Sequence, residues 1–139
     1  MKTLIVEDEF ISRTLLTEIL SPYGNCHIAI NGREALEMLE KACEEDQRYD
    51  LVCLDIIMPE KDGHEVLAGI REMEELRGIN GMSATKVIMT TALDDTYNIM
   101  EAFARGHCEA YLTKPIERRK LLDHLYELKL LDTSGHALV

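Results

Sequence analysis

The sequence predicts an α/β fold in which helices cover both faces of a parallel sheet. The first reason is that short apolar runs alternate along the chain with segments whose apolar residues recur at helical spacing. The second is that four of the apolar runs end directly at an acid, a threonine or a lysine. In an open parallel sheet the carboxyl ends of the strands lie along one edge, where ligands bind, so we expect these polar residues to meet there.

The first two βα units are predicted in the amino-terminal third of the chain. A strand at 4–6 precedes a helix that ends at the turn-forming sequence 21–25. The expected buried positions of this helix are Phe10, Ile11, Leu15, Leu16, Ile19 and Leu20. A second strand near 26–30 leads through Asn31-Gly32 into a helix whose apolar face contains Ala35, Leu36, Leu39, Ala42 and Cys43.

Three further units complete the predicted sheet. The third strand, 51–55, is followed by a helix from Gly63 with an apolar face of Val66, Leu67, Ile70 and Met73. The fourth strand, 86–90, precedes a helix capped by Asp94 or Asp95, with Ile99, Ala102 and Phe103 on its inner face. The fifth strand, about 109–113, leads to a last helix from about 117 to 131 with an apolar face of Leu121, Leu122, Leu125 and Leu128.

We expect one domain over residues 1–131 and a flexible tail at 132–139. The tail contains too few apolar residues to dock firmly and should fray. Between the third helix and the fourth strand, the segment 77–85 is expected to be a mobile loop. The alternative for this segment is a partner-specific contact through Ile79 and Met82.

Composition limits the classes of partner. The 139 residues include 26 acids and 15 bases, and the net charge of −11 argues against direct binding to nucleic acid or to an anionic membrane surface. The four cysteines show no CxxC spacing, so we expect reduced thiols rather than disulfides or zinc ligands. The chain shows no signal-peptide region and no apolar run near the ~20 residues of a membrane helix, so it is expected to be cytoplasmic and to act on a protein.

The acids at the strand ends predict a magnesium site. Glu7 and Asp8 follow the first strand, and Asp55 ends the third. Two carboxylates about 5 Å apart repel by roughly 3 kcal/mol at an effective dielectric constant of about 20, so three of them require a cation. Oxygen ligands favour Mg²⁺ over zinc. The other two strand ends add a hydroxyl and an ammonium group, from Thr90 or Thr91 and from Lys114.

These motifs together resemble the receiver domain of bacterial two-component response regulators, and the single-domain chemotaxis type is the nearest in shape. Each motif alone is weak, but their order and spacing over most of the chain are specific. The matching residues are Glu7-Asp8, the stretch 54–59 with Asp62-Gly63, Thr91-Ala92 and Lys114-Pro115. The resemblance implies a flavodoxin-like (βα)5 fold with strand order 2-1-3-4-5, in which the reversal between strands 1 and 3 places the acidic pair beside Asp55.

The resemblance also implies a role for each acid. Asp55 would be the phosphoacceptor, because a carboxylate can attack phosphorus to give an acyl phosphate. Asp8 and Asp55 would ligate Mg²⁺ through their side chains, and Ile57 through its backbone carbonyl. Glu7 would act through a water or from outside the first coordination sphere. No other cofactor is expected.

Three more residues would handle the phosphoryl group and report its presence. Lys114, before a cis peptide bond to Pro115, and the hydroxyl of Thr91 would each take a phosphoryl oxygen. Thr91 is preferred over Thr90 because Ala92 follows it, as in the family. Tyr111 would be the aromatic switch, which fills the space that Thr91 leaves as the population of two packings shifts.

The implied function is that of a stand-alone phosphorylation switch. Its partners would be a sensor histidine kinase or phosphotransfer protein and a downstream protein that binds the face formed by the fourth helix, fifth strand and fifth helix. The protein would be a monomer or a weak, phosphorylation-dependent dimer. It would catalyse only its own phosphorylation and a slow dephosphorylation, because Ile57 and Leu93 stand where fast members of the family carry polar side chains.

Three alternatives remain open from the sequence. The first is a phosphorelay intermediate that passes its phosphoryl group onward. The second is a flavin-binding module of similar strand order, but the chain contains neither GxGxxG nor GxxxxGK[ST]. The third is an aspartyl-phosphate hydrolase, which normally carries its nucleophile on the first strand rather than on the third.

Overall fold

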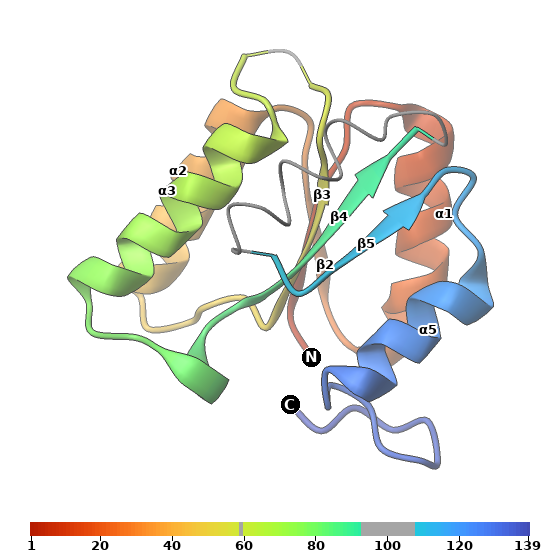
Figure 1. Cartoon of the computed structure of the whole chain (residues 1–139). Coiled ribbons are helices and arrows are strands. Elements are labelled where there is room, and N and C mark those ends of the chain that lie inside the picture. Colours follow the sequence, from red (N-terminus) through yellow and green to blue (C-terminus); the bar gives the residue numbers. More distant parts are fainter. Residues whose placement is uncertain (59, 93–107) are drawn as a thin grey trace.

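The sheet of this protein has five parallel strands in the order β2-β1-β3-β4-β5, as predicted (Figure 1). The structure is a computed structural model, which describes residues 1–58, 60–92 and 108–139. The strands are β1 (Thr3–Val6), β2 (Cys26–Ala29), β3 (Leu51–Asp55), β4 (Lys86–Thr91) and β5 (Ala110–Thr113). The reversal of strand order falls between β1 and β3, so the carboxyl ends of these two strands are neighbours.

Helices cover both faces of the sheet (Figure 1). On one face lie α2 (Gly32–Glu44) and α3 (Gly63–Leu76), and on the other lie α1 (Phe10–Leu20) and α5 (Arg118–Glu127). Short 3-10 turns occupy Ser21–Tyr23 and Gly81–Ser83. The helix expected between the fourth and fifth strands lies outside the described residues.

Strand alternation divides the apolar side chains into two cores. Leu54 packs in the core under α2 and α3, whereas its neighbour Cys53 packs in the core under α1 and α5. In β1, Val6 likewise packs in the core under α2 and α3, and Ile5 packs in the core under α1 and α5. Since side chains two residues apart on a strand share a face, Asp55 follows Cys53 onto the α1 and α5 side of the sheet.

The expected buried face of the first helix was wrong at its start. Phe10 and Ile11 are 69% and 74% exposed, and the buried residues of α1 are Ser12, Leu16, Ile19 and Leu20. These four positions form one stripe at about 100° per residue, and the first two residues of the helix fall outside it.

The last helix ends at Glu127, four residues earlier than predicted. Lys129 has a left-handed φ of 62° and donates its N–H to the Tyr126 carbonyl, at 3.0 Å. Leu130 donates its N–H to the Leu125 carbonyl, at 2.9 Å, which completes a Schellman motif. Leu130 is nevertheless buried, because the chain turns back toward the core after the helix.

The segment expected to be a flexible tail has a definite path in the structure. Asp132 accepts hydrogen bonds from the backbone N–H groups of Ser134 and His136, at 2.9 and 2.8 Å. Leu138 donates its N–H to the Leu130 carbonyl, at 2.9 Å. The domain limit at residue 131 and the mobility of residues 132–139 stay predictions.

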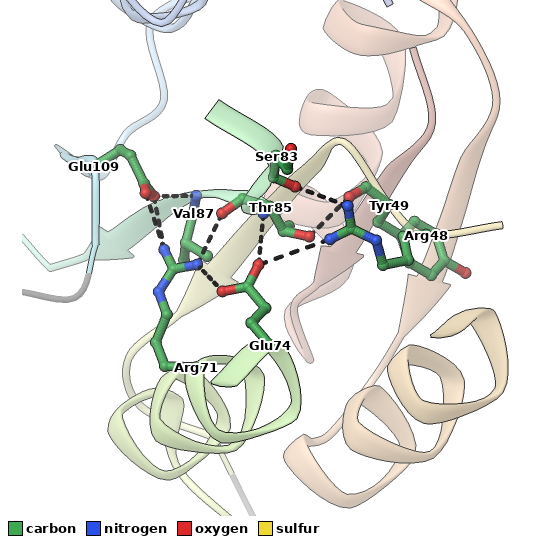
Figure 2. Close-up of polar contacts among 8 residues, drawn as sticks. All are labelled: Arg48, Tyr49, Arg71, Glu74, Ser83, Thr85, Val87 and Glu109. Atoms are coloured by element: carbon green, nitrogen blue, oxygen red, sulfur yellow. Dashed lines mark hydrogen bonds and ion pairs between the residues drawn. The ribbon is translucent and has the colours of Figure 1, made fainter. Parts of the chain in front are cut away.

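A polar network joins the end of α3 to the starts of β4 and β5 (Figure 2). Arg71 pairs with Glu74 one helical turn away, at 2.7 Å, and its other terminal nitrogen lies 3.0 Å from both carboxylate oxygens of Glu109. Glu74 accepts the Thr85 N–H and Glu109 accepts the Val87 N–H, each at 2.6 Å. The network thereby binds the loop between α3 and β4 at its return to the sheet.

The same loop is bound on its other side by Arg48. The Arg48 guanidinium donates a hydrogen bond to the Ser83 carbonyl, at 2.8 Å, and lies 3.9 Å from Glu74 (Figure 2). Ile79 is half-buried and Met82 is exposed. Mobility of this loop and a partner contact through it stay predictions.

Candidate functional site

Acidic side chains meet at the carboxyl ends of β1 and β3. Glu7 and Asp8 directly follow β1, and Asp55 is the last residue of β3. One carboxylate oxygen from each of these three residues lies within 4.8 Å of the others. Glu7 is completely buried, Asp55 is 6% exposed and Asp8 is exposed. The structure therefore brings together the acids that the sequence placed at one edge.

Lys114 completes this group from the end of β5. Its Nζ lies 2.6 Å from Oε1 of Glu7 and 3.4 Å from Oδ2 of Asp55. The Lys114 N–H donates to the Thr91 carbonyl, at 2.7 Å, and the peptide bond to Pro115 is cis, as expected. The lysine side chain thus points into the acidic group rather than into solvent.

The surroundings of Asp55 disfavour the charged, deprotonated form of its carboxyl group. Burial and the adjacent Glu7 carboxylate raise the pKa of Asp55 to about 8, against the opposing effects of Lys114 and of the Ile57 N–H, which lies 3.4 Å from Oδ1. Burial works against the charge of Lys114, but the two buried carboxylates outweigh it and raise its pKa above the ordinary value. More negative charge is therefore collected here than one ammonium group balances.

The residues present fit a hard divalent cation such as Mg²⁺. Glu7 Oε2 is buried and has no hydrogen-bond partner among the described residues. A buried carboxylate oxygen without a partner is costly, and a cation at this point would compensate it. The donors are oxygens only, which is the ligand set of magnesium and calcium rather than of zinc.

The loop after Asp55 leads directly from the site to α3. Its residue Ile57, the expected source of a carbonyl ligand, is 62% exposed. The Ile56 N–H donates to the Thr90 carbonyl, at 3.0 Å, and the Gly63 N–H donates to the Ile56 carbonyl, at 2.7 Å. Asp62 then caps α3 by accepting the Glu65 N–H, at 3.0 Å.

The remaining predicted residues lie near the same edge. Thr90 is the register partner of Asp55, and both Thr90 and Thr91 are buried at the end of β4. The Thr90 hydroxyl has no hydrogen-bond partner in the described part of the chain. Tyr111 is partly buried against the core under α2 and α3. Leu93, the second predicted flanking position, lies outside the described residues.

Sequence reasoning assigned no packing role to two glycines that shape the site. A Cβ on Gly63 would lie 2.6 Å from the Asp55 carbonyl oxygen, and one on Gly32 would lie 2.1 Å from the Lys61 carbonyl oxygen. Gly32 was interpreted only as a turn residue before the second helix. The motif Asp62-Gly63 gave a signal for the first glycine, but no local signal reveals which distant backbone approaches the second.

The fold and the acidic edge together define a doubly wound α/β protein with a charged site at its topological switch point. Residues 3–126 match the family model of the response regulator receiver domain. The chain belongs to this family, whose members accept a phosphoryl group in two-component signalling. The match lends no support to a flavin-binding module.

Two curated relatives of this chain are longer than the chain. The sensory/regulatory protein RpfC of Xanthomonas campestris is 33% identical over 128 residues, which are 92% of this chain and 16% of that protein. The probable transcriptional regulator ycf29 of Porphyra purpurea is 32% identical over 131 residues, which are 94% of this chain and 57% of that protein. The chain thus spans a minor part of the first relative and little more than half of the second.

Solved receiver structures superpose closely on this fold. Chemotaxis protein CheY4 of Vibrio cholerae has a TM-score of 0.73 and 26% identity, with 91% of this chain and 97% of that chain covered. The receiver domain of a Pseudomonas aeruginosa sensor histidine kinase, with magnesium in its active-site cleft, has a TM-score of 0.74 and 25% identity, with 91% of this chain and 95% of that chain covered.

Among the described helices, none is long and apolar enough to span a membrane.

Proposed function

We propose that Asp55 is the phosphoacceptor of this receiver domain. The single observation that carries the assignment is its position: a buried carboxylate between the acids Glu7 and Asp8 and the ammonium group of Lys114, 3.4 Å away. Nucleophile, cation site and charge-neutralising lysine are therefore adjacent. Glu7, Asp8, Asp55 and the Ile57 carbonyl would hold the Mg²⁺, with Glu7 acting through a water or from outside the first coordination sphere.

The chemistry is phosphoryl transfer from nitrogen to oxygen. A carboxylate oxygen of Asp55 forms a bond to phosphorus while the bond from phosphorus to the imidazole nitrogen of a phosphohistidine breaks, and the bonding electrons remain on that nitrogen. Mg²⁺, when bound, supplies positive charge to one phosphoryl oxygen. Lys114 neutralises a second oxygen, and the Thr91 hydroxyl donates to the third.

The partners follow from this chemistry. A sensor histidine kinase or a phosphotransfer protein would supply the phosphoryl group, and a downstream protein would read the change through the surface around β5 and α5. A solved neighbour of this fold is a chain of the CheX–CheY–BeF₃–Mg complex of Borrelia burgdorferi, with a TM-score of 0.74 and 26% identity. The expected helix of the output surface lies outside the described residues, and the cytoplasmic location, the oligomeric state and the switch role of Tyr111 stay predictions.

Labelling with a small phosphodonor tests the assignment without a kinase. Purified protein is incubated with acetyl phosphate and MgCl₂, and the gain of one phosphoryl group is followed by intact mass and by its lability to hydroxylamine. Asp55→Asn should abolish the gain, and the exposed helix residue Asp123 gives a matched control, Asp123→Asn, that should keep it. Labelling of Asp55→Asn, or labelling that persists in EDTA, would contradict the assignment.

A further inference from the structure

Gly32, at the start of α2, touches the loop that follows Asp55. A Cβ built on Gly32 would lie 2.1 Å from the Lys61 carbonyl oxygen and 2.7 Å from the Lys61 Cβ. Atoms at such distances overlap, so any side chain at position 32 must displace the backbone at Lys61. We propose that Gly32 is a positioning residue, whose missing side chain fixes the loop carrying the Ile57 carbonyl in the place where it can ligate Mg²⁺.

Backbone conformation does not explain a glycine at this position. The φ of Gly32 is outside the left-handed range, unlike those of Gly24, Gly78, Gly81 and Gly135. Alanine would therefore fit the local backbone, and in a helix it is favoured over glycine. Close approach of the Lys61 backbone is the feature that requires glycine here.

The described residues of the loop are held in place at both of its ends. At its base, the Gly63 N–H binds the Ile56 carbonyl, at 2.7 Å, and Gly63 packs on the Asp55 backbone. Near its tip, Glu60 and Lys61 both have left-handed φ values, 56° and 75°, which non-glycine residues adopt at a cost. A displaced Lys61 would therefore pass its shift toward the residues at the site.

A second contact joins the same two segments but is weaker. Arg33 Nε lies 3.0 Å from a carboxylate oxygen of Glu60, and both side chains are more than half exposed. Exposed ion pairs of this kind contribute little to stability, because solvent and salt screen them. The packing of Gly32 against Lys61, rather than this ion pair, therefore sets the distance between α2 and the loop.

The inference rests on the proposed function, and metal affinity measures it directly. Residues that orient metal ligands typically change metal affinity by roughly 10- to 100-fold when they are replaced. The melting temperature should rise as MgCl₂ is added, and the magnesium midpoint is the MgCl₂ concentration that gives half of the full rise. We expect Gly32→Ala to increase this midpoint by about tenfold or more. In the metal-free protein, the amide NMR signals of Ile57 and Asp55 should shift as well.

Gly69→Ala is a matched control at the contact between α2 and α3. Its Cβ would lie 2.6 Å from Cδ2 of Leu36, the far end of a flexible side chain that can move aside. This variant should keep the magnesium midpoint and the NMR signals of residues 55–57. If Gly32→Ala is folded and keeps both as well, the positioning role is refuted.

A double variant covers the case in which Gly32→Ala does not fold. Lys61→Gly removes the Cβ at the contact and allows the loop backbone to adopt other conformations at little cost. In the Gly32→Ala background it should restore folding and part of the magnesium affinity. Failure of the double variant to fold would show that α2 needs a glycine at position 32 in order to begin there. That result would overturn the proposal. Failure of the wild-type protein to bind Mg²⁺ would count against the proposed function itself.

Discussion

The ammonium group of Lys114 lies 2.6 Å from a carboxylate oxygen of Glu7, a side chain with no exposed surface. Glu7 therefore depends on Lys114 for charge compensation as long as no metal is bound. The same lysine is only 3.4 Å from Asp55, so one cation serves two buried acids. The proposed phosphorylation chemistry and the stability of the metal-free protein would thus be coupled through Lys114.

Replacement of Lys114 by methionine should destabilise the metal-free protein by on the order of 3 kcal/mol, because a buried carboxylate would lose its partner. Saturating MgCl₂ should recover more of this loss than it adds to the wild type. Urea unfolding in EDTA and in MgCl₂ measures both effects. Lys120→Met is the control, since Lys120 forms an exposed pair with Glu117, at 3.4 Å, and should cost less than about 1 kcal/mol. Equal losses for the two variants would contradict the prediction.

The stability of the metal-free protein should fall as pH rises from about 4 to about 8. The pKa of Asp55 is raised from 3.8 to about 8, chiefly by burial and by Glu7, so the folded state holds this proton more tightly than the unfolded state does. The resulting stabilisation is complete below the ordinary pKa and is lost as pH approaches 8. Urea unfolding in EDTA at pH 5 and pH 8 should show a larger decline for the wild type than for Asp55→Asn. Parallel declines would show that another group causes the pH dependence.

The network at the end of α3 should be a major source of stability. Glu74 is buried, and Arg71 joins it to Glu109 and to the Thr85 carbonyl. Arg71→Met should therefore cost roughly 3 kcal/mol, because it removes the nearer cation of a buried carboxylate and leaves only Arg48, which lies 3.9 Å from Glu74. Arg33→Met, which removes an exposed arginine with two exposed acidic partners, should cost less than about 1 kcal/mol. Thermal unfolding compares the two variants, and a small effect of Arg71→Met would show that the network adds little.

Local patterns in the sequence were sufficient to predict the strands and the polar residues at their carboxyl ends, whereas the strand order was predicted from the handedness of crossovers and the family resemblance. Continuous apolar runs marked the strands, and their end residues Glu7, Asp55 and Lys114 had to meet once the strand order was known. Two predictions about the helices were wrong, namely the buried face of the first helix and the last residue of α5. Phe10 is apolar but lies off the buried stripe of α1, and the buried Leu130 follows a left-handed residue that ends α5.

Contacts between distant segments could not be predicted. Arg71 and Glu109 are 38 residues apart in the sequence, and arginine and glutamate are residue types that usually lie on the surface. Gly32 looked like a turn residue, because the approach of Lys61 depends on how α2 and the loop after β3 pack. Sequence periodicity defines which face of an element is buried, but it contains no information on which backbone atoms come within van der Waals distance of each other.

The aspartyl phosphate should be long-lived for this family. Hydrolysis requires a water held in line behind phosphorus, and the residue two positions after Asp55 is Ile57, an exposed aliphatic side chain that can neither orient nor deprotonate it. A well-placed hydrogen-bonding group can be worth about 3 kcal/mol, or roughly a hundredfold in rate, so Ile57→Asn should speed the loss of phosphate by about tenfold or more. Loss of phosphate from the purified protein at neutral pH gives the rate directly. Leu76→Asn, an exposed change at the far end of α3, should leave the rate unchanged. Rapid decay in the wild type, or no acceleration in Ile57→Asn, would show that other residues control the water.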